Sequence, residues 1–194
     1  IKKKISKSHP KSETAIFSKK TISIIKLLFS SMKLNDFIKI KKDIRIVFLT
    51  RNPHDVISSL LKKKWFSNHN LIKHFNLFAY RDYNKVKIPY WYDKNGKTWF
   101  DMTEIERCFY YYNLIYSFKN HKNIIYVDYD DFTKKKSRQN LLFSKLNLIK
   151  TKSTFKLLKN ITIKKSIKID YKIKKHYMFE KANNLYQEKI KHLD

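Results

Sequence analysis

A short apolar run followed at once by a helical pattern stands in the first half of the chain. Residues 44–49 are apolar except for Arg45, and this mixture of β-branched, aliphatic and aromatic side chains is typical of a strand buried in a parallel sheet. Pro53 ends the run because it has no N–H to give to a strand ladder. The spacing then becomes helical, with apolar residues at Val56, Ile57, Leu60 and Leu61. This pattern predicts a strand, a tight turn and a helix.

A second helix and strand are predicted further along the chain. Residues 103–106 read Thr-Glu-Ile-Glu, which is a capping box, and an apolar stripe at helical spacing follows as far as Tyr116. Cys108 belongs to that stripe and is expected in the core. Residues 123–128, whose four central side chains are apolar, then predict a strand that could join the first one in a parallel sheet.

Two further helices and a hairpin are also predicted. Residues 21–32 predict a helix, followed by a lysine-rich connection into the first strand, and residues 176–193 predict an amphipathic helix. Asn95-Gly96 predicts a type I′ hairpin turn between two aromatic runs. Residues 65–102 are rich in aromatic side chains, which either stack on a sugar or phenol ring or fill a secondary core.

The chain is very basic, with a formal net charge of +28 over 194 residues. Only five of its basic residues are arginines and the rest are lysines, a composition that partly reflects AT-rich codons. The remaining excess favours anionic partners, such as nucleotide cofactors, sulfated or phosphorylated glycans, nucleic acid or an anionic membrane surface. The length suits a single domain with a real core.

Several classes of protein are excluded by composition. The one cysteine, Cys108, rules out an internal disulfide and a cysteine-based zinc site, and the histidines show no metal-binding spacing, so no metal is expected. No apolar run is long enough to cross a membrane, and no signal peptide is recognisable. The compartment stays open, because the chain begins with isoleucine and an upstream signal or anchor could exist; without one, the cytoplasm is expected.

Arg51 is the first candidate site residue, because it follows the predicted strand and precedes a helix N-terminus. Free N–H groups and the positive end of the helix dipole suit a phosphate there, and a guanidinium can add a bidentate pair. Ser59, eight residues later, could offer a hydroxyl donor. The alternative is that Arg51 caps the sheet edge through a salt bridge and Ser59 is a packing residue.

The segment RNPHDVISS, residues 51–59, resembles the 3′-phosphate-binding segment of sulfotransferases that use 3′-phosphoadenosine 5′-phosphosulfate (PAPS). In that family the equivalents of Arg51 and Ser59 hold the 3′-phosphate of the cofactor. Residues 129–132, Tyr-Asp-Asp-Phe, look like the family's Tyr-Glu-Asp-Leu after a late strand, and residues 141–148 resemble the helix that follows.

The resemblance covers about residues 1–150 and implies an α/β fold with a P-loop NTPase-like parallel sheet flanked by helices. The chain would then be a single sulfotransferase-like domain, residues 1–194, whose N-terminal strand and phosphosulfate loop are missing. The helical part, residues 150–194, matches poorly. The family's late Arg-Lys-Gly segment has no clear counterpart, although Lys174-Lys175 could stand in.

Residues 5–17 allow two interpretations under this resemblance. In the first, ISKSHPK is similar to the family's Lys-Thr-His segment, and His9 would be the general base that takes the acceptor's proton. In the second, PKSETAIF is similar to the phosphosulfate loop, and Lys11 and Ser12 would bind the cofactor. Glu13 stands where that loop has glycine, and its carboxylate would repel a phosphate. A third possibility is a terminus without function.

The resemblance implies an enzyme that transfers a sulfuryl group from PAPS to a hydroxyl or amine of a small molecule, glycan or protein. One alternative is a basic module that binds nucleic acid through lysines and interleaved aromatic residues, although no recognition motif supports it. Another is a catalytically inactive relative that binds only the nucleotide or a sulfated glycan. The acceptor and the oligomeric state are not determined by the sequence.

Overall fold

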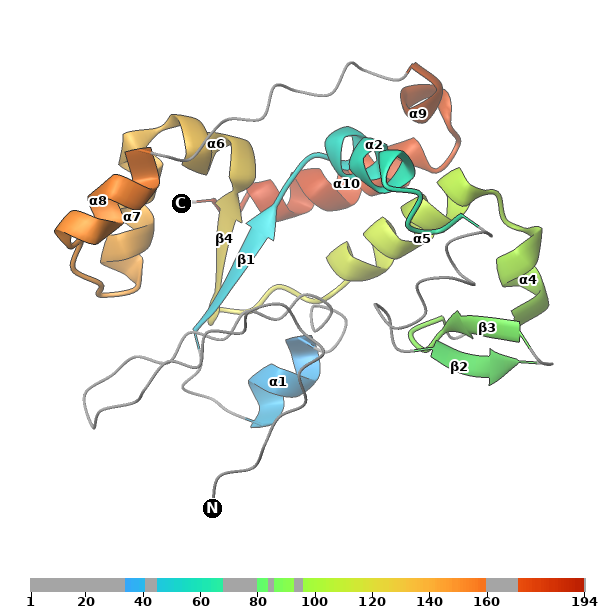
Figure 1. The fold of residues 1–194 in the computed structure, drawn as a ribbon. Coiled ribbons are helices and arrows are strands. Elements are labelled where there is room, and N and C mark those ends of the chain that lie inside the picture. The colour runs from blue at the N-terminus through green and yellow to red at the C-terminus, as the bar shows by residue number, and fades with distance from the viewer. Residues whose placement is uncertain are drawn as a thin grey trace.

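The computed structural model describes residues 34–40, 45–67, 80–83, 86–92, 96–159 and 171–193 (Figure 1). In chain order the elements are α1 (Leu34–Ile40), β1 (Ile46–Thr50), α2 (Pro53–Lys62), β2 (Tyr80–Tyr83), β3 (Val86–Pro89), α4 (Gly96–Asp101), α5 (Glu104–Tyr116), β4 (Ile124–Asp128), α6 (Tyr129–Lys134), α7 (Lys136–Lys145), α8 (Lys152–Lys159), α9 (Tyr171–Lys175) and α10 (Phe179–Ile190).

Strands β1 and β4 pair in parallel, as the two apolar runs predicted. Their register joins Ile46 to Ile124 and Thr50 to Asp128, so the two carboxyl ends lie side by side. Figure 1 shows α2, α5 and α10 on one side of this strand pair, and α6 and α7 on the other. The described residues therefore form a mixed α/β fold around a small parallel sheet, and this confirms the α/β class.

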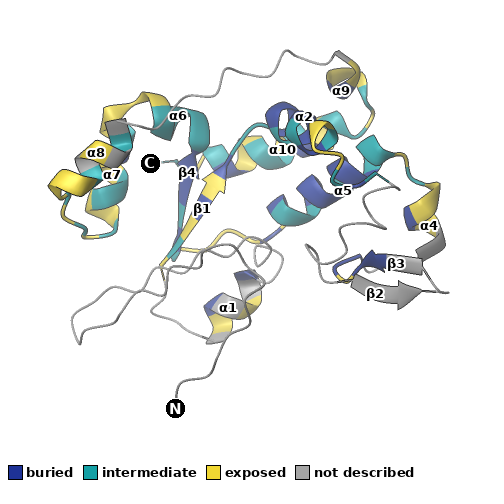
Figure 2. Cartoon of the chain, viewed as in Figure 1, coloured by how far each residue is buried: buried dark blue, intermediate teal, exposed yellow. Residues whose placement is uncertain are grey.

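Strand β1 is buried on one face only. Phe48 and Thr50 point into the core, whereas Val47 is 39% and Leu49 57% exposed. Figure 2 shows that β1 is more exposed than β4, most of whose residues are buried. The prediction of a fully buried strand is wrong for the face that carries Val47 and Leu49, because the apolar run alone does not show how many layers cover a strand.

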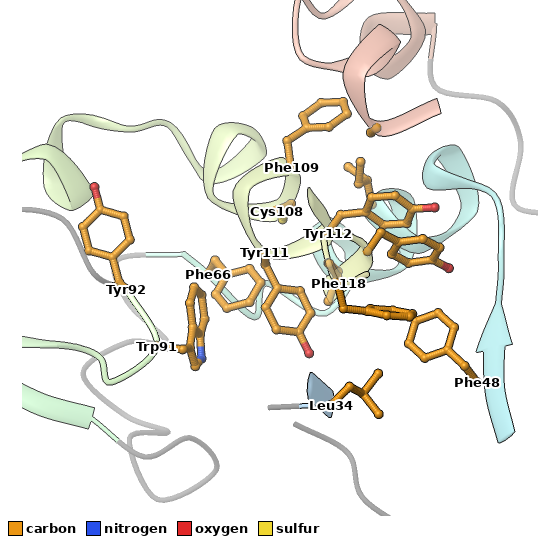
Figure 3. Packing of buried hydrophobic residues seen from close by; sticks show 14 of the residues in the cluster. Leu34, Phe48, Phe66, Trp91, Tyr92, Cys108, Phe109, Tyr111, Tyr112 and Phe118 are labelled. Atoms are coloured by element: carbon orange, nitrogen blue, oxygen red, sulfur yellow. The ribbon is translucent and has the colours of Figure 1, made fainter. Parts of the chain in front are cut away.

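The core beside the sheet is aromatic. The ring of Phe48 meets the rings of Tyr116, Phe118 and Tyr126 edge to face, with centroids 5.5, 4.8 and 6.2 Å away. Figure 3 shows Phe48 reaching from β1 toward Phe118. Cys108 is fully buried in α5, as its place in the apolar stripe predicted.

A second aromatic cluster lies at the other end of α5 (Figure 3). Trp99 and Phe66 are fully buried, and Trp91 packs edge-on against both, with centroids 5.5 and 6.0 Å away. Arg107 is 2% exposed and donates hydrogen bonds to the carbonyls of Trp99, Phe66 and Phe100. The aromatic side chains of Trp99, Phe66 and Trp91, all within residues 65–102, therefore fill a secondary core, as one of the two interpretations predicted.

Two predictions from the pattern are wrong. Gly96 does not form a hairpin turn: it begins α4, and the helix carries Trp99 inward to the buried cluster, a packing gain that overrides local turn preference. The antiparallel hairpin is instead β2 with β3. The lysine-rich connection before β1 contains the helix α1, whose Leu34 and Ile38 are buried one turn apart. The helix predicted at residues 21–32 lies outside the described residues.

The helix ends follow local chemistry. Thr103 and Glu106 form the predicted capping box, with the Thr103 N–H donating to Glu106 Oε2 over 2.7 Å. Helix α2 ends at Lys62, and Lys64 takes φ 52°, which turns the chain so that the Trp65 N–H reaches the Leu60 carbonyl. The final helix α10 lies within the range predicted for it.

Candidate functional site

The candidate site lies at the shared carboxyl end of β1 and β4. Arg51 follows β1 directly, and Asp128 is the last residue of β4. Helices α2 and α6 begin within three residues of these strand ends. In open parallel sheets this edge is where ligands bind, because loops and helix N-termini converge there. The strand, turn and helix predicted from the sequence therefore meet where a phosphate site would be expected.

The Arg51 side chain is bound by neighbouring groups, but not all of its N–H donors form hydrogen bonds within the described part of the chain. Its Nη2 donates to Asp55 Oδ2 over 3.3 Å, and its guanidinium carbon lies 4.9 Å from the centre of the Tyr129 ring. The side chain is 27% exposed, while its Nε is buried with no hydrogen-bond partner among the described residues. A guanidinium carries five N–H donors, so this arrangement leaves donors for an anion.

The turn after Arg51 is closed by an Asn cap. The Asp55 N–H donates to Asn52 Oδ1 over 2.9 Å, and Pro53 occupies the first turn, where a missing N–H costs nothing. Asn52 Nδ2 in turn donates to Asp55 Oδ2 over 3.1 Å. The Asp55 carboxylate is thus shared between the Arg51 guanidinium, the Asn52 cap and the His54 ring, whose Nδ1 lies 3.3 Å from Asp55 Oδ1. The Arg51–Asp55 pair is the salt bridge considered as the alternative role of Arg51.

The backbone of Arg51 is bound by two tyrosines of α5. Its N–H donates to the Tyr116 hydroxyl over 2.8 Å, and its carbonyl accepts from Tyr112 over 2.8 Å and from Tyr116 over 3.1 Å. Both tyrosines are almost fully buried, and their rings stack with centroids 4.2 Å apart. Burial raises the pKa of both phenols, so they are neutral at physiological pH.

Asp128 joins a helix far along the chain to the same edge. Its Oδ1 accepts from the Asp131 N–H over 2.9 Å and caps α6, while its Oδ2 accepts from the Tyr186 hydroxyl of α10 over 2.8 Å. Burial raises the pKa of Tyr186, and the Asp128 carboxylate raises it further. Asp131 also pairs with Lys135 over 2.8 Å.

The other predicted site residues fall in different places. Ser59 is half-buried on α2, four residues after Asp55, so the two lie on one face of the helix. No hydrogen bond between Ser59 and Arg51 is recorded among the described residues. His9, Lys11 and Ser12 lie outside those residues, and with them both interpretations of residues 5–17.

Lys174 and Lys175, the stand-ins for the family's late basic segment, lie on α9. This short helix contacts α2. Its Ile173 is buried in the core, whereas both lysines are exposed. The lysines are therefore carried by an element that packs against the helix of the candidate site.

Sequence reasoning missed three residues of the site: Tyr112 and Tyr116 as ligands of the Arg51 backbone, and Tyr186 as the partner of Asp128. The two tyrosines of α5 were assigned only to an apolar stripe. Their spacing of four residues, with both hydroxyls on one helix face, was an available signal. Tyr186 gave no such signal, because its partner is 58 residues away in the chain.

The described residues contain no group of histidine, cysteine or acidic side chains that could hold a metal ion. None of the helices described is long and apolar enough to cross a membrane.

No protein-family model, no curated protein and no solved structure matches this chain. A function for it must therefore be argued from the residues of the site and from the resemblance in residues 51–59 and 129–132.

Proposed function

We propose that this chain binds PAPS and is a sulfotransferase, with a P-loop NTPase-like sheet of which β1 and β4 are two strands. The observation that carries the proposal is Arg51 at the carboxyl end of β1, directly before the capped N-terminus of α2. This geometry agrees with the resemblance of residues 51–59 to the 3′-phosphate-binding segment of the family.

Arg51 would bind the 3′-phosphate with donors that the fold leaves available. Two oxygens of a phosphate can each accept from one terminal nitrogen of the guanidinium as a bidentate pair, which is stronger than a single 3.3 Å contact to Asp55. The positive end of the α2 dipole adds to this attraction. The ring of Tyr129 supports the guanidinium face and leaves its edge for the anion.

Ser59 would supply a second donor to the same phosphate. It follows Asp55 by one helical turn, on the helix face toward which Arg51 folds through its ion pair. Lys174 and Lys175 of α9 would add positive charge beside α2. The site fits a doubly charged anion better than a neutral ligand.

When bound, the cofactor would supply an activated sulfuryl group to a hydroxyl or amine acceptor on a small molecule, glycan or protein. His9 is the proposed base that takes the acceptor's proton, and Lys11 and Ser12 are the alternative cofactor ligands of the same segment. Arg51 and Ser59 would contribute by position, since anchoring the 3′-phosphate fixes the other end of the cofactor for in-line attack.

The test is calorimetric titration of the 194-residue chain with adenosine 3′,5′-bisphosphate and with AMP, which lacks the 3′-phosphate. We expect tighter binding of the bisphosphate, and Arg51→Ala should weaken it by at least about tenfold, because a charged hydrogen-bonded pair is lost. AMP binding should change little.

The matched control is Arg45→Ala. Arg45 precedes the other end of β1, where its Nη1 donates to the Lys145 carbonyl over 2.6 Å, so the same charge is lost away from the site. Equal binding of the two nucleotides by the wild-type chain would overturn the cofactor assignment. Equal effects of Arg45→Ala and Arg51→Ala would show that binding depends on the overall positive charge and not on a site at Arg51.

A nucleic-acid-binding module is the second candidate, favoured by the net charge of +28. It predicts binding of single strands that weakens steeply with salt and is insensitive to Arg51→Ala. A catalytically inactive relative would instead bind the bisphosphate selectively without transferring sulfate from PAPS to any acceptor.

A further inference from the structure

The Arg51 peptide would lack hydrogen-bond partners without α5. The ladder between β1 and β4 ends at the pair Thr50–Asp128, and the first backbone bond of α2 joins the Val56 N–H to the Asn52 carbonyl. The N–H and carbonyl of Arg51 fall between these two systems, in a partly buried position. Backbone groups left unpaired in such a position would destabilise the folded protein, and the two tyrosine hydroxyls supply the missing hydrogen bonds.

The two hydroxyls are themselves rigidly placed. Tyr112 and Tyr116 are 1% and 4% exposed, lie one turn apart on α5, and stack with an interplanar angle of 14°. Tyr116 alone both accepts from the N–H and donates to the carbonyl of Arg51. The two peptide units that flank the Arg51 Cα are therefore both fixed in orientation, and so is the Cα from which the guanidinium side chain extends.

We propose that Tyr112 and Tyr116 are positioning residues that aim the Arg51 guanidinium and thereby set the preference for a nucleotide with a 3′-phosphate. This rests on the proposed function of Arg51. The guanidinium stands at the end of a long side chain, so a small rotation of its peptide displaces the bidentate donors by enough to lose their alignment. In this role the two tyrosines act on the nucleotide only through Arg51, because their hydroxyls bind the Arg51 backbone.

The experiment compares Tyr116→Phe and Tyr112→Phe with Tyr111→Phe in the full chain. Tyr111 is a buried tyrosine on the same helix that packs against Phe66 and Trp91 in the other aromatic cluster, so it controls for loss of a buried phenol. Affinities for adenosine 3′,5′-bisphosphate and for AMP are measured for each variant. We expect the ratio of the two to fall about three- to tenfold in Tyr116→Phe, less in Tyr112→Phe, and not in Tyr111→Phe.

A second measurement tests the clamp without any nucleotide. Hydrogen exchange at the Arg51 amide should accelerate about tenfold or more in Tyr116→Phe, since its acceptor is removed, and stay near the wild-type rate in Tyr111→Phe. Thermal unfolding of each variant shows whether it is folded. If Tyr116→Phe does not fold, the affinity ratio of Tyr112→Phe, which loses only a bond to the Arg51 carbonyl, carries the test.

The outcomes separate the two proposals. If wild-type protein does not prefer the bisphosphate, the proposed function fails, and this inference fails with it. If the wild type prefers it and the ratio is unchanged in folded Tyr116→Phe and Tyr112→Phe, only the positioning role is wrong. A uniform loss of affinity for both nucleotides in these variants would also overturn that role, because it indicates general loosening.

Discussion

The Arg51 side chain has a carboxylate partner in this structure, Asp55, and the proposed function would give it a second, anionic partner. Its guanidinium contacts Asp55 at 3.3 Å and covers the Tyr129 ring, while its Nε has no hydrogen-bond partner among the described residues. A single long contact is a modest ion pair when one partner is partly exposed. The pair keeps the arginine folded against α2, and under the proposed function it would be exchanged for stronger phosphate contacts.

Asp55→Asn tests this competition. The change keeps the size of the side chain but removes a negative charge that both attracts the guanidinium and repels a phosphate. We expect affinity for adenosine 3′,5′-bisphosphate to rise about two- to fivefold, measured by titration calorimetry. Unchanged or weaker binding in a folded variant would show that Asp55 orients Arg51 rather than competing for it.

At the scale of the elements, mutation of a buried polar side chain that joins two elements should cost the most stability. Arg107 of α5 ties α4 and the turn after α2 to one helix through three backbone carbonyls. Burial lowers the pKa of this guanidinium, and nearby Glu104 opposes the shift. Its contacts to the Trp99 and Phe66 carbonyls hold together the second aromatic cluster.

Arg107→Met should therefore destabilise the protein by about 3 kcal/mol, because it leaves three buried or partly buried carbonyls without their donor. The measurement is the urea unfolding midpoint followed by circular dichroism. Arg138→Met is the matched control: Arg138 is about half exposed and donates to the Leu193 carbonyl over 2.9 Å, so its loss should cost about 1 kcal/mol or less. Similar shifts for the two variants would contradict the role given to Arg107.

At the scale of the molecule, the core of the described residues contains several buried tyrosines beside its aliphatic, phenylalanine and tryptophan side chains. Burial raises the pKa of Tyr111, Tyr112 and Tyr116, and raises that of Tyr126 to about 12. In the unfolded chain a tyrosine titrates at about pH 10. Above that pH the folded state binds more protons than the unfolded state, so folding becomes less favourable as pH rises.

The free energy of unfolding should be independent of these groups below about pH 10 and fall above it, by up to about 1.4 kcal/mol per pH unit for each buried tyrosine. Urea midpoints between about pH 8 and pH 11 measure this. High salt is needed throughout, because lysines lose charge in the same range and the relief of self-repulsion acts in the opposite direction. Phenolate absorbance that develops fully while the helical signal is intact would contradict the prediction.

Much of the local structure could be predicted because its causes lie within a few residues. The apolar run at 44–49 with Pro53 after it placed β1 and α2 to within about two residues, and the Thr103–Glu106 capping box placed the start of α5. Where local signals competed with packing, the prediction was wrong. Asn95-Gly96 is typical of a turn, but Gly96 begins a helix that buries Trp99. Local propensity is small beside the burial of a large aromatic ring.

The sequence by itself determined the strand, the capped helix and the arginine between them, since periodicity, proline and caps act over one or two turns. Tertiary structure decided what surrounds that arginine. Its backbone is bound by tyrosines 61 and 65 residues away, and Asp128 is bound by a tyrosine 58 residues away. Such contacts depend on the parallel register of β1 and β4 and on how α5 and α10 pack beside them, which no local pattern specifies.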